Sequence, residues 1–140
     1  ITSFWIPLDK VNKDNSGLLY VKGSHKWPQR FKALSPDYVA AIIDEKMDDI
    51  PDINANLDKY ELLHWDMEPG DVIAFHALTL HGASGNRSTA RRRRAWATRW
   101  CGDDARYGAR VGQISPPIEG HGLKPGDRLE CETFPKVWPA

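Results

Sequence analysis

The chain has 140 residues, the length of one domain, and 41% of them are hydrophobic and 27% charged. This is ordinary globular composition, and it excludes a disordered or fibrous protein. Basic and acidic residues balance to a formal net charge of zero, which excludes a general nucleic-acid or membrane-surface binder.

The apolar runs and the cysteines indicate the cellular compartment, and the tryptophans indicate the core. No apolar run approaches the ~20 residues of a membrane span, and no signal peptide is recognisable. Cys101 and Cys131 are too few for a disulfide framework and are expected to be buried thiols in a reducing compartment. We therefore expect a cytoplasmic protein. Six tryptophans are expected to lie mostly in the core.

The chain opens on segments that favour strands. Residues 1–8 are apolar and aromatic, residues 9–17 have turn composition, and residues 18–21 form a short second strand, so the two strands are predicted to form a hairpin. Because chains rarely open inside a core strand, we expect residues upstream of this sequence. An unpaired edge at residues 1–8 also predicts pairing with another chain, as in a homo-oligomer.

A helical insertion is predicted over residues 26–58. Ser35 and Pro36 are typical of an N-cap and a first helical turn, and Pro51 ends the segment. Apolar residues follow at helical spacing. They are Tyr38, Val39, Ile42, Ile43 and Met47.

The second half again favours short strands and turns. Strands are predicted over residues 57–66, 72–80 and 93–100, with a Pro-Gly-Asp turn at 69–71 and a loop-rich tail over 105–140. Short strands with Gly and Pro turns indicate a single sandwich or barrel domain rather than a doubly wound fold.

Two histidines are candidates for a metal site. His76 and His81 are five residues apart, so on one regular strand they face opposite sides and at most one enters a shared site. His81 ends its predicted strand before a Gly-rich loop, where a ligand is fixed while the loop leaves room. The alternative for His81 is a hydrogen-bonded rim histidine, and the residues alone leave both open.

The arginine run at 91–94 is the second feature. Strand alternation places Arg93, Ala95, Ala97 and Arg99 on one face and Arg94, Trp96, Thr98 and Trp100 on the other. Two small residues between two arginines are typical of a strand that lines a narrow anionic pocket. An arginine there can bind a carboxylate through two parallel hydrogen bonds.

These features belong to an ordered series of short motifs. They are WIPLD (5–9), NSG (15–17), VKGSH (21–25), EPGDV (68–72), FH (75–76), LHG (80–82) and RRA (93–95). The series resembles the phytanoyl-CoA dioxygenase family of iron(II)- and 2-oxoglutarate-dependent oxygenases. The segments at 100–104, 115–117 and 134–138 resemble the C-terminal end of bacterial members.

The resemblance implies a mainly β fold, a double-stranded β-helix (jelly-roll, cupin-like) incomplete at its N-terminus. It implies iron(II) held by two histidines and a carboxylate, with positions left for 2-oxoglutarate and O2. His81 would be the distal metal histidine. Arg93, with Arg92 as the alternative, would bind the far carboxylate of 2-oxoglutarate. Trp5 would contact 2-oxoglutarate, and its alternative role is core packing.

Some positions depart from the family pattern. The family's first metal motif, His-x-Asp, lies upstream of the opening strand and is not among these residues. His64-Trp65-Asp66 matches its letters but lies in the wrong strand, so we interpret it as a surface-facing i, i+2 pair. Lys22 replaces the usual proline of the Pro-Gly-Ser-His turn, where His25 is expected to be structural.

The function implied is a dioxygenase that hydroxylates a small organic substrate while 2-oxoglutarate is converted to succinate, with Trp96 and Trp100 near the substrate. The alternative is an inactive jelly-roll homologue, or a fragment, that acts as a small-molecule binding module. A metal-dependent hydrolase or isomerase on a cupin-like barrel is a weaker rival. It needs more ligands than the one credible histidine and leaves Arg93 without a role.

Overall fold

The computed structural model describes residues 1–32, 47–108 and 118–138. Most of the helix predicted from Ser35 lies outside these residues. The chain forms two compact units. The first contains Ile1–Pro28 and Asp52–Trp100, and the second contains Gln29–Pro51 and Cys101–Ala140.

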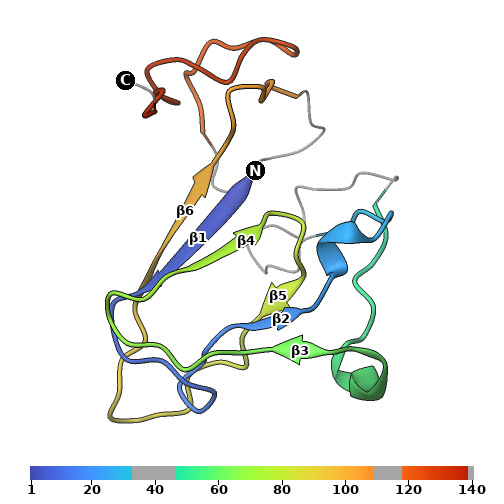
Figure 1. Cartoon of the computed structure of the whole chain (residues 1–140), viewed down its shortest axis with the longest axis vertical. Helices are drawn as coiled ribbons and strands as arrows, with labels where there is room; N and C mark the ends of the chain where they lie inside the picture. The colour runs from blue at the N-terminus through green and yellow to red at the C-terminus, as the bar shows by residue number, and fades with distance from the viewer. Residues whose placement is uncertain (33–46, 109–117, 139–140) are drawn as a thin grey trace. The chain divides into compact units, whose positions relative to one another are not determined.

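The first unit carries two three-stranded antiparallel sheets, with strand orders β4-β1-β6 and β3-β2-β5 (Figure 1). The strands are β1 (Thr2–Pro7), β2 (Leu19–Val21), β3 (Leu62–Leu63), β4 (Ile73–His76), β5 (His81–Gly82) and β6 (Ala95–Trp100). Two short 3-10 helices, η1 (Ser24–Lys26) and η2 (Asn54–Lys59), lie in the connections.

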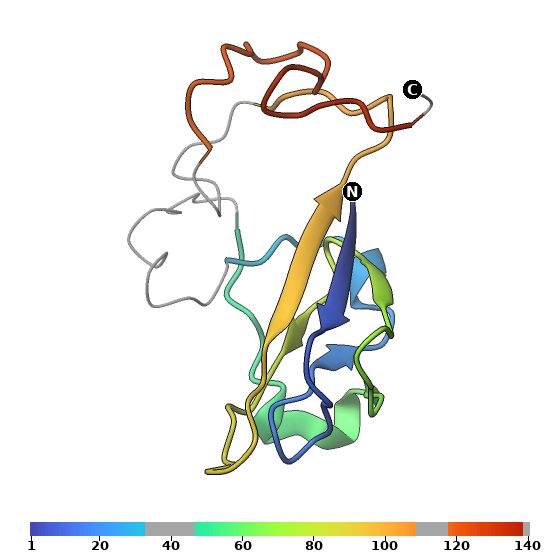
Figure 2. The same cartoon turned by 90° about the vertical axis from the view of Figure 1, so that its left-hand side faces the viewer.

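Strand β1 is the centre of the first sheet. It pairs with β4 on one side and with β6 on the other, and Figure 2 shows β1 (blue) alongside β6 (orange). The predicted hairpin of β1 with β2 is therefore wrong, because these strands belong to different sheets. Since β1 has hydrogen-bonded neighbours on both sides, the edge-pairing argument for a homo-oligomer loses its basis, and the oligomeric state stays a prediction.

The second sheet is made of shorter strands than predicted. The segment 57–66 contributes only β3, because Leu57–Lys59 belong to η2. The segment 72–80 contributes only β4, since the Thr79 amide donates to the His76 carbonyl (2.9 Å) and turns the chain, and β5 of the second sheet begins at His81. His76 and His81 therefore lie on different strands. The prediction that they face opposite sides assumed a single strand, so it does not apply.

The core of the first unit gathers around Trp5, Val11 and Met67. Val11 and Met67 exchange both backbone hydrogen bonds at 2.8 Å. The two sheets meet through aromatic rings, since Tyr20 of β2 lies edge-on to Phe75 of β4 with ring centroids 5.0 Å apart. Apolar burial between the sheets is the main force that holds such a two-layer fold together.

The expectation for the tryptophans was wrong. Trp5 is buried, whereas Trp65, Trp96, Trp100 and Trp138 are exposed, the last by 83%. On β6 the reason is the register: Trp96 and Trp100 pair with Ile6 and Thr2, on the face away from Trp5. They therefore do not point toward the side of the sheet where Trp5 lies.

The second unit is built mostly from turns in its described residues. Tyr107 accepts from the Gly126 amide (2.8 Å) and donates to the Asp127 carbonyl (2.8 Å), and its ring lies against His121. Cys101 is exposed and Cys131 half-buried, and both are free thiols, so the prediction of buried cysteines was wrong. Among the described residues, no helix is long and apolar enough to cross a bilayer.

Candidate functional site

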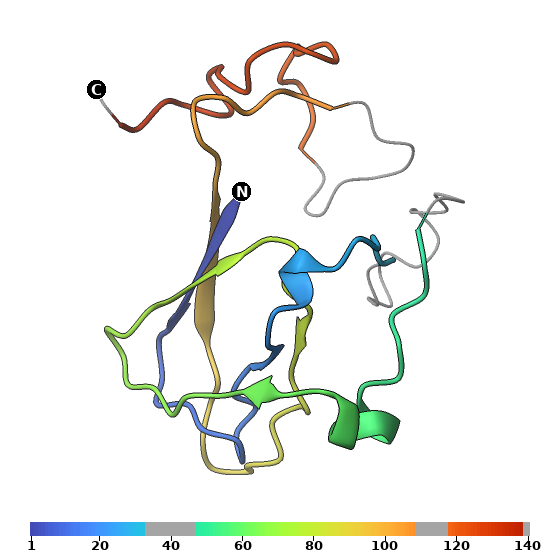
Figure 3. The ribbon, with the colours of Figure 1, turned by 45° about the vertical axis from the view of Figure 1, so that its right-hand side comes forward.

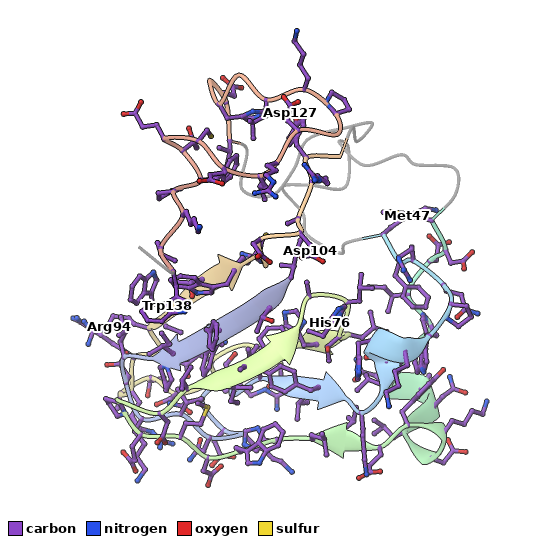
Figure 4. The ribbon with its side chains drawn as sticks, turned by 45° about the horizontal axis from the view of Figure 1, so that its top comes forward. Met47, His76, Arg94, Asp104, Asp127 and Trp138 are labelled. Carbon is purple, nitrogen blue, oxygen red and sulfur yellow. The ribbon has the colours of Figure 1, made fainter. Side chains whose placement is uncertain are left out.

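The ion pair between Arg94 and Asp9 shows which side chains of the arginine run 91–94 face outward. Arg94 donates to both Asp9 oxygens, from Nε (3.0 Å) and Nη2 (2.7 Å), and its amide donates as well (2.8 Å). These hydrogen bonds lower the pKa of Asp9 to about 2. Figure 4 shows Arg94 projecting from the rim of the unit. Because neighbouring side chains alternate in extended chain, Arg93 faces the opposite side.

Arg93 lies over the ring of Trp5. Its guanidinium carbon is 4.9 Å from the ring centroid, and its Nε donates to the Ser16 carbonyl at 3.1 Å. Burial lowers the pKa of the Arg93 guanidinium. Within the described part of the chain no carboxylate pairs with Arg93, and its two terminal nitrogens make no hydrogen bond. An arginine that is partly withdrawn from water is stabilised when an anion pairs with it.

The loop of residues 10–17 holds the carbonyl that Arg93 uses. The fully buried Asn15 accepts from the Asn12 amide (2.7 Å) and donates to the Lys10 carbonyl (2.7 Å). Ser16 has a positive φ of 75°, which non-glycine residues rarely adopt. The loop is therefore a strained turn, held by side-chain hydrogen bonds, that aims the Ser16 carbonyl at Arg93.

His81 has the hydrogen-bond pattern of a metal-ligating histidine. Its Nδ1 lies 2.8 Å from the Thr79 carbonyl, and since a carbonyl only accepts, Nδ1 carries the proton. In the neutral ring Nε2 then keeps its lone pair, an arrangement common among histidine ligands. The ring stacks on Tyr20 (5.9 Å, 23°) and meets the edge of Phe75 (4.9 Å).

Ser24 positions His81, a role that the sequence did not reveal. The buried Ser24 Oγ donates to the Val21 carbonyl and accepts from the Leu80 amide, both at 2.8 Å. Leu80 directly precedes His81, and its carbonyl accepts from the Val21 amide (2.9 Å). Figure 3 shows the segment after β4 passing beside η1. Through Ser24, the Gly-Ser-His turn therefore holds by hydrogen bonds the residue that directly precedes His81.

Tyr20 was also missed. It pairs with His81 in the β2–β5 register, and its side chain is only 3% exposed. Its hydroxyl has no hydrogen-bond partner among the described residues. Burial raises the pKa of Tyr20 to about 12, and the charge of Arg93 partly offsets this rise. Strand alternation indicates that Tyr20 points inward, but no pattern in the sequence predicts an unpaired hydroxyl.

The other histidines are used elsewhere. His64 Nδ1 donates to the Leu18 carbonyl, and Nε2 lies against Asp66, both at 3.1 Å. The His64 side chain is only 8% exposed whereas that of Asp66 is 74% exposed, so the prediction of a surface-facing pair was wrong for His64 and right for Asp66. The ring of His76, labelled in Figure 4, lies 5.6 Å from that of His25.

The described residues do not complete an iron site. They contain no group of three or more His, Cys, Asp or Glu side chains that would hold a metal ion. On His81 the ring nitrogen Nε2 has no hydrogen-bond partner among the described residues. Similarly, the terminal nitrogens of Arg93 and the hydroxyl of Tyr20 are hydrogen-bond donors that have no partner among the described residues.

Comparison with solved structures defines the class of protein. The non-heme alpha ketoglutarate dependent carbocyclase SnoK from nogalamycin biosynthesis superposes with a TM-score of 0.68 at 28% identity, over 96% of this chain and 47% of that chain. The epimerase SnoN, solved in complex with Fe3+, alpha ketoglutarate and nogalamycin RO, gives 0.64 at 23% identity, over 96% and 49%. The mainly β jelly-roll prediction is thus confirmed.

The sequence comparisons give the family. The model of the phytanoyl-CoA dioxygenase (PhyH) family matches residues 1–95, and the chain belongs to this family. A probable phytanoyl-CoA dioxygenase of Caenorhabditis elegans is 28% identical over 103 residues, which is 71% of this chain and 30% of the relative. The 1-deoxypentalenic acid 11-beta-hydroxylase of Streptomyces arenae is 34% identical over 84 residues, or 60% and 29%. The chain therefore spans under a third of these relatives and about half of the solved structures.

Proposed function

We propose that this protein is an Fe(II)- and 2-oxoglutarate-dependent dioxygenase that hydroxylates a small organic substrate, and that it works in the cytoplasm. One observation carries the proposal. Arg93 is half-buried over Trp5 without a carboxylate partner in the described part of the chain, and its terminal nitrogens are free there. A desolvated cation of this kind is stabilised by a bound anion, and the far carboxylate of 2-oxoglutarate is the anion that the family predicts.

Each residue then has a defined task. Arg93 binds the far carboxylate through its terminal nitrogens while Nε stays on the Ser16 carbonyl, so the guanidinium cannot rotate when the ligand arrives. Trp5 forms the apolar floor beneath the guanidinium and excludes water from one of its faces. His81 presents Nε2 as a ligand, oriented by the hydrogen bond of Nδ1 to Thr79. When bound, iron supplies the oxidative chemistry with O2.

The test is an anaerobic titration of Fe(II) into the full-length protein, with and without 2-oxoglutarate. The readout is the visible absorption band of the iron–oxoglutarate chelate. We expect the band in the wild type and its loss in His81→Ala, while His121→Ala in the second unit serves as the matched control and keeps the band. A wild type that binds Fe(II) and 2-oxoglutarate without forming the band would contradict the proposal.

A binding module is the second candidate, and the absence of a three-ligand metal group among the described residues is the observation that favours it. The same titration separates the two functions. A module would bind 2-oxoglutarate through Arg93 without iron, and His81→Ala would leave that affinity unchanged. The dioxygenase requires that the affinity for 2-oxoglutarate rise when iron is present.

A further inference from the structure

Arg99 of β6 is a second arginine on the face of Arg93, and the proposed chemistry leaves it unused. Ala95 and Ala97 separate the two arginines along that face. The side chain of Arg99 is exposed, and its guanidinium forms no ion pair or hydrogen bond with any described residue. An arginine in this state is free to bind an anion from solution.

The register of the first sheet shows which side Arg99 faces. Arg99 pairs with Ser3 of β1, and Ser3 pairs with Phe75 of β4. The next side chain, Trp100, lies on the opposite face, because its ring meets the edge of Phe4 at 6.3 Å between centroids. Since side chains alternate along a strand, Arg99 lies on the face through which Phe75 meets the second sheet.

The same row of residues leads from Arg99 to His81. The ring of Phe75 meets that of His81 at 4.9 Å between centroids. Neighbouring strands are about 4.8 Å apart, so the backbone of Arg99 lies ~10 Å across the sheet from that of Phe75. Arg93 lies further along the chain direction, since the residues between it and Arg99 span roughly 20 Å of extended strand. The two arginines therefore do not bind the same carboxylate, and Arg99 is the one in the row that reaches His81.

We propose that Arg99 binds the carboxylate of the primary substrate, which is therefore a small organic acid. This inference rests on the proposed function and names the substrate class. The carboxylate pairs with the guanidinium of Arg99, and the carbon skeleton extends past Ser3 and Phe75 toward His81. Because a guanidinium fork binds a carboxylate in a defined orientation, the pair holds one part of the skeleton toward the reacting centre.

The experiment measures a preference for acids over amides. A panel of small linear and cyclic carboxylic acids, each with its own primary amide, is tested for binding to the full-length protein by ligand-observed NMR without iron. Acid and amide share one skeleton, so the difference in their dissociation constants reports on the negative charge. We expect the wild type to bind the tightest acid roughly 10-fold better than its amide, since a hydrogen bond to a charged group is involved. Arg99→Gln should bind the two equally.

Two further variants separate Arg99 from a general effect of charge. Arg87→Gln removes the same charge from an exposed loop of the same unit and should keep the preference for acids. Arg99→Lys keeps the charge but loses the planar fork, so it should restore only part of the preference. A wild type without a preference for acids would overturn the inference. An Arg99→Gln protein that keeps the preference would overturn it too, and a lower melting temperature in that variant would then assign Arg99 to the structure.

Failure of the proposed function gives a different result. The spectra are repeated with anaerobic Fe(II), because paramagnetic iron broadens the signals of a ligand bound close to it. Broadening of the bound acid, lost in His81→Ala, would support the inference by placing the acid beside the metal. If the wild type binds no iron, the proposed function fails, whereas a preference for acids that is lost in Arg99→Gln still supports the anion site. A wild type that binds iron without broadening the bound acid would overturn the inference, since the acid would then bind elsewhere.

Discussion

Gly17 is the position at which the smallest change should disturb the site most. A Cβ at this residue would lie 2.4 Å from His64 Cε1 and 2.8 Å from the Asn12 carbonyl oxygen. The ring of His64 cannot easily move, because its nitrogens face the Leu18 carbonyl and Asp66. The Asn12 carbonyl is backbone, and it accepts from the Gly17 amide at 2.7 Å. Gly17→Ala must therefore shift the loop.

The expected cost is that of overpacking, about 1–3 kcal/mol in the free energy of unfolding. The assay is equilibrium unfolding in urea on the full-length protein. Affinity for 2-oxoglutarate should fall as well, because Gly17 follows Ser16, whose carbonyl holds Arg93 Nε. Gly108→Ala is the matched control, since a Cβ there meets nothing within 4 Å.

A double mutant sharpens the argument. In His64→Ala/Gly17→Ala the contact with Cε1 is gone while the contact with the Asn12 carbonyl remains, so the cost of Gly17→Ala should shrink but not vanish. If Gly17→Ala behaved like Gly108→Ala in both unfolding and 2-oxoglutarate affinity, the packing of this loop as described would be refuted.

Three further predictions follow from the charges and the backbone. Asp9, whose pKa of about 2 lies below the usual 3.8 because of Arg94, stabilises the fold above pH 4. That contribution is lost as the pH falls through 2, so the stability difference between wild type and Asp9→Asn should vanish there. The buried phenol of Tyr20, with a pKa of about 12, should give a late step near that pH in an absorbance titration of the tyrosines. Its contribution to stability is full below about pH 10 and is lost as the pH rises through 12; a Tyr20→Phe protein that keeps the late step would disprove the assignment. Ser16→Gly should relieve the positive φ and stabilise the protein by about 1 kcal/mol in urea unfolding, with unchanged 2-oxoglutarate affinity because the carbonyl that holds Arg93 remains; a loss of stability would show that the serine side chain matters more than the strain.

Local patterns predicted part of this molecule well. Period-two alternation placed Arg93 and Arg94 on opposite faces, and the Asp9 pair shows which arginine remains outside. The resemblance named Trp5 and Arg93 together, and they are in contact. Whether they bind 2-oxoglutarate, and whether His81 binds iron, stays a prediction. The fold class followed from the ordered motifs and is confirmed by the solved relatives.

Sheet pairing was beyond local patterns. Strand β1 has neighbours that lie about 70 and 95 residues further along the chain, and antiparallel pairing over such distances leaves no signature within the strand itself. The hairpin predicted for β1 and β2 assumed that neighbours in sequence pair in space. For the same reason the sequence did not predict the unpaired hydroxyl of Tyr20. That hydroxyl lacks a partner because of the rings that surround it in space, which lie on other segments.

The central claim is that Arg93, and not its neighbour Arg92, holds the far carboxylate of 2-oxoglutarate. The most direct test is the dissociation constant of 2-oxoglutarate for Arg93→Met and Arg92→Met in the full-length protein under anaerobic Fe(II). We predict that Arg93→Met weakens binding roughly 100-fold, as expected when a charge-assisted pair of hydrogen bonds is lost, while Arg92→Met stays within about 2-fold because Arg92 is exposed. Equal effects of the two substitutions, or a larger effect of Arg92→Met, would contradict the account.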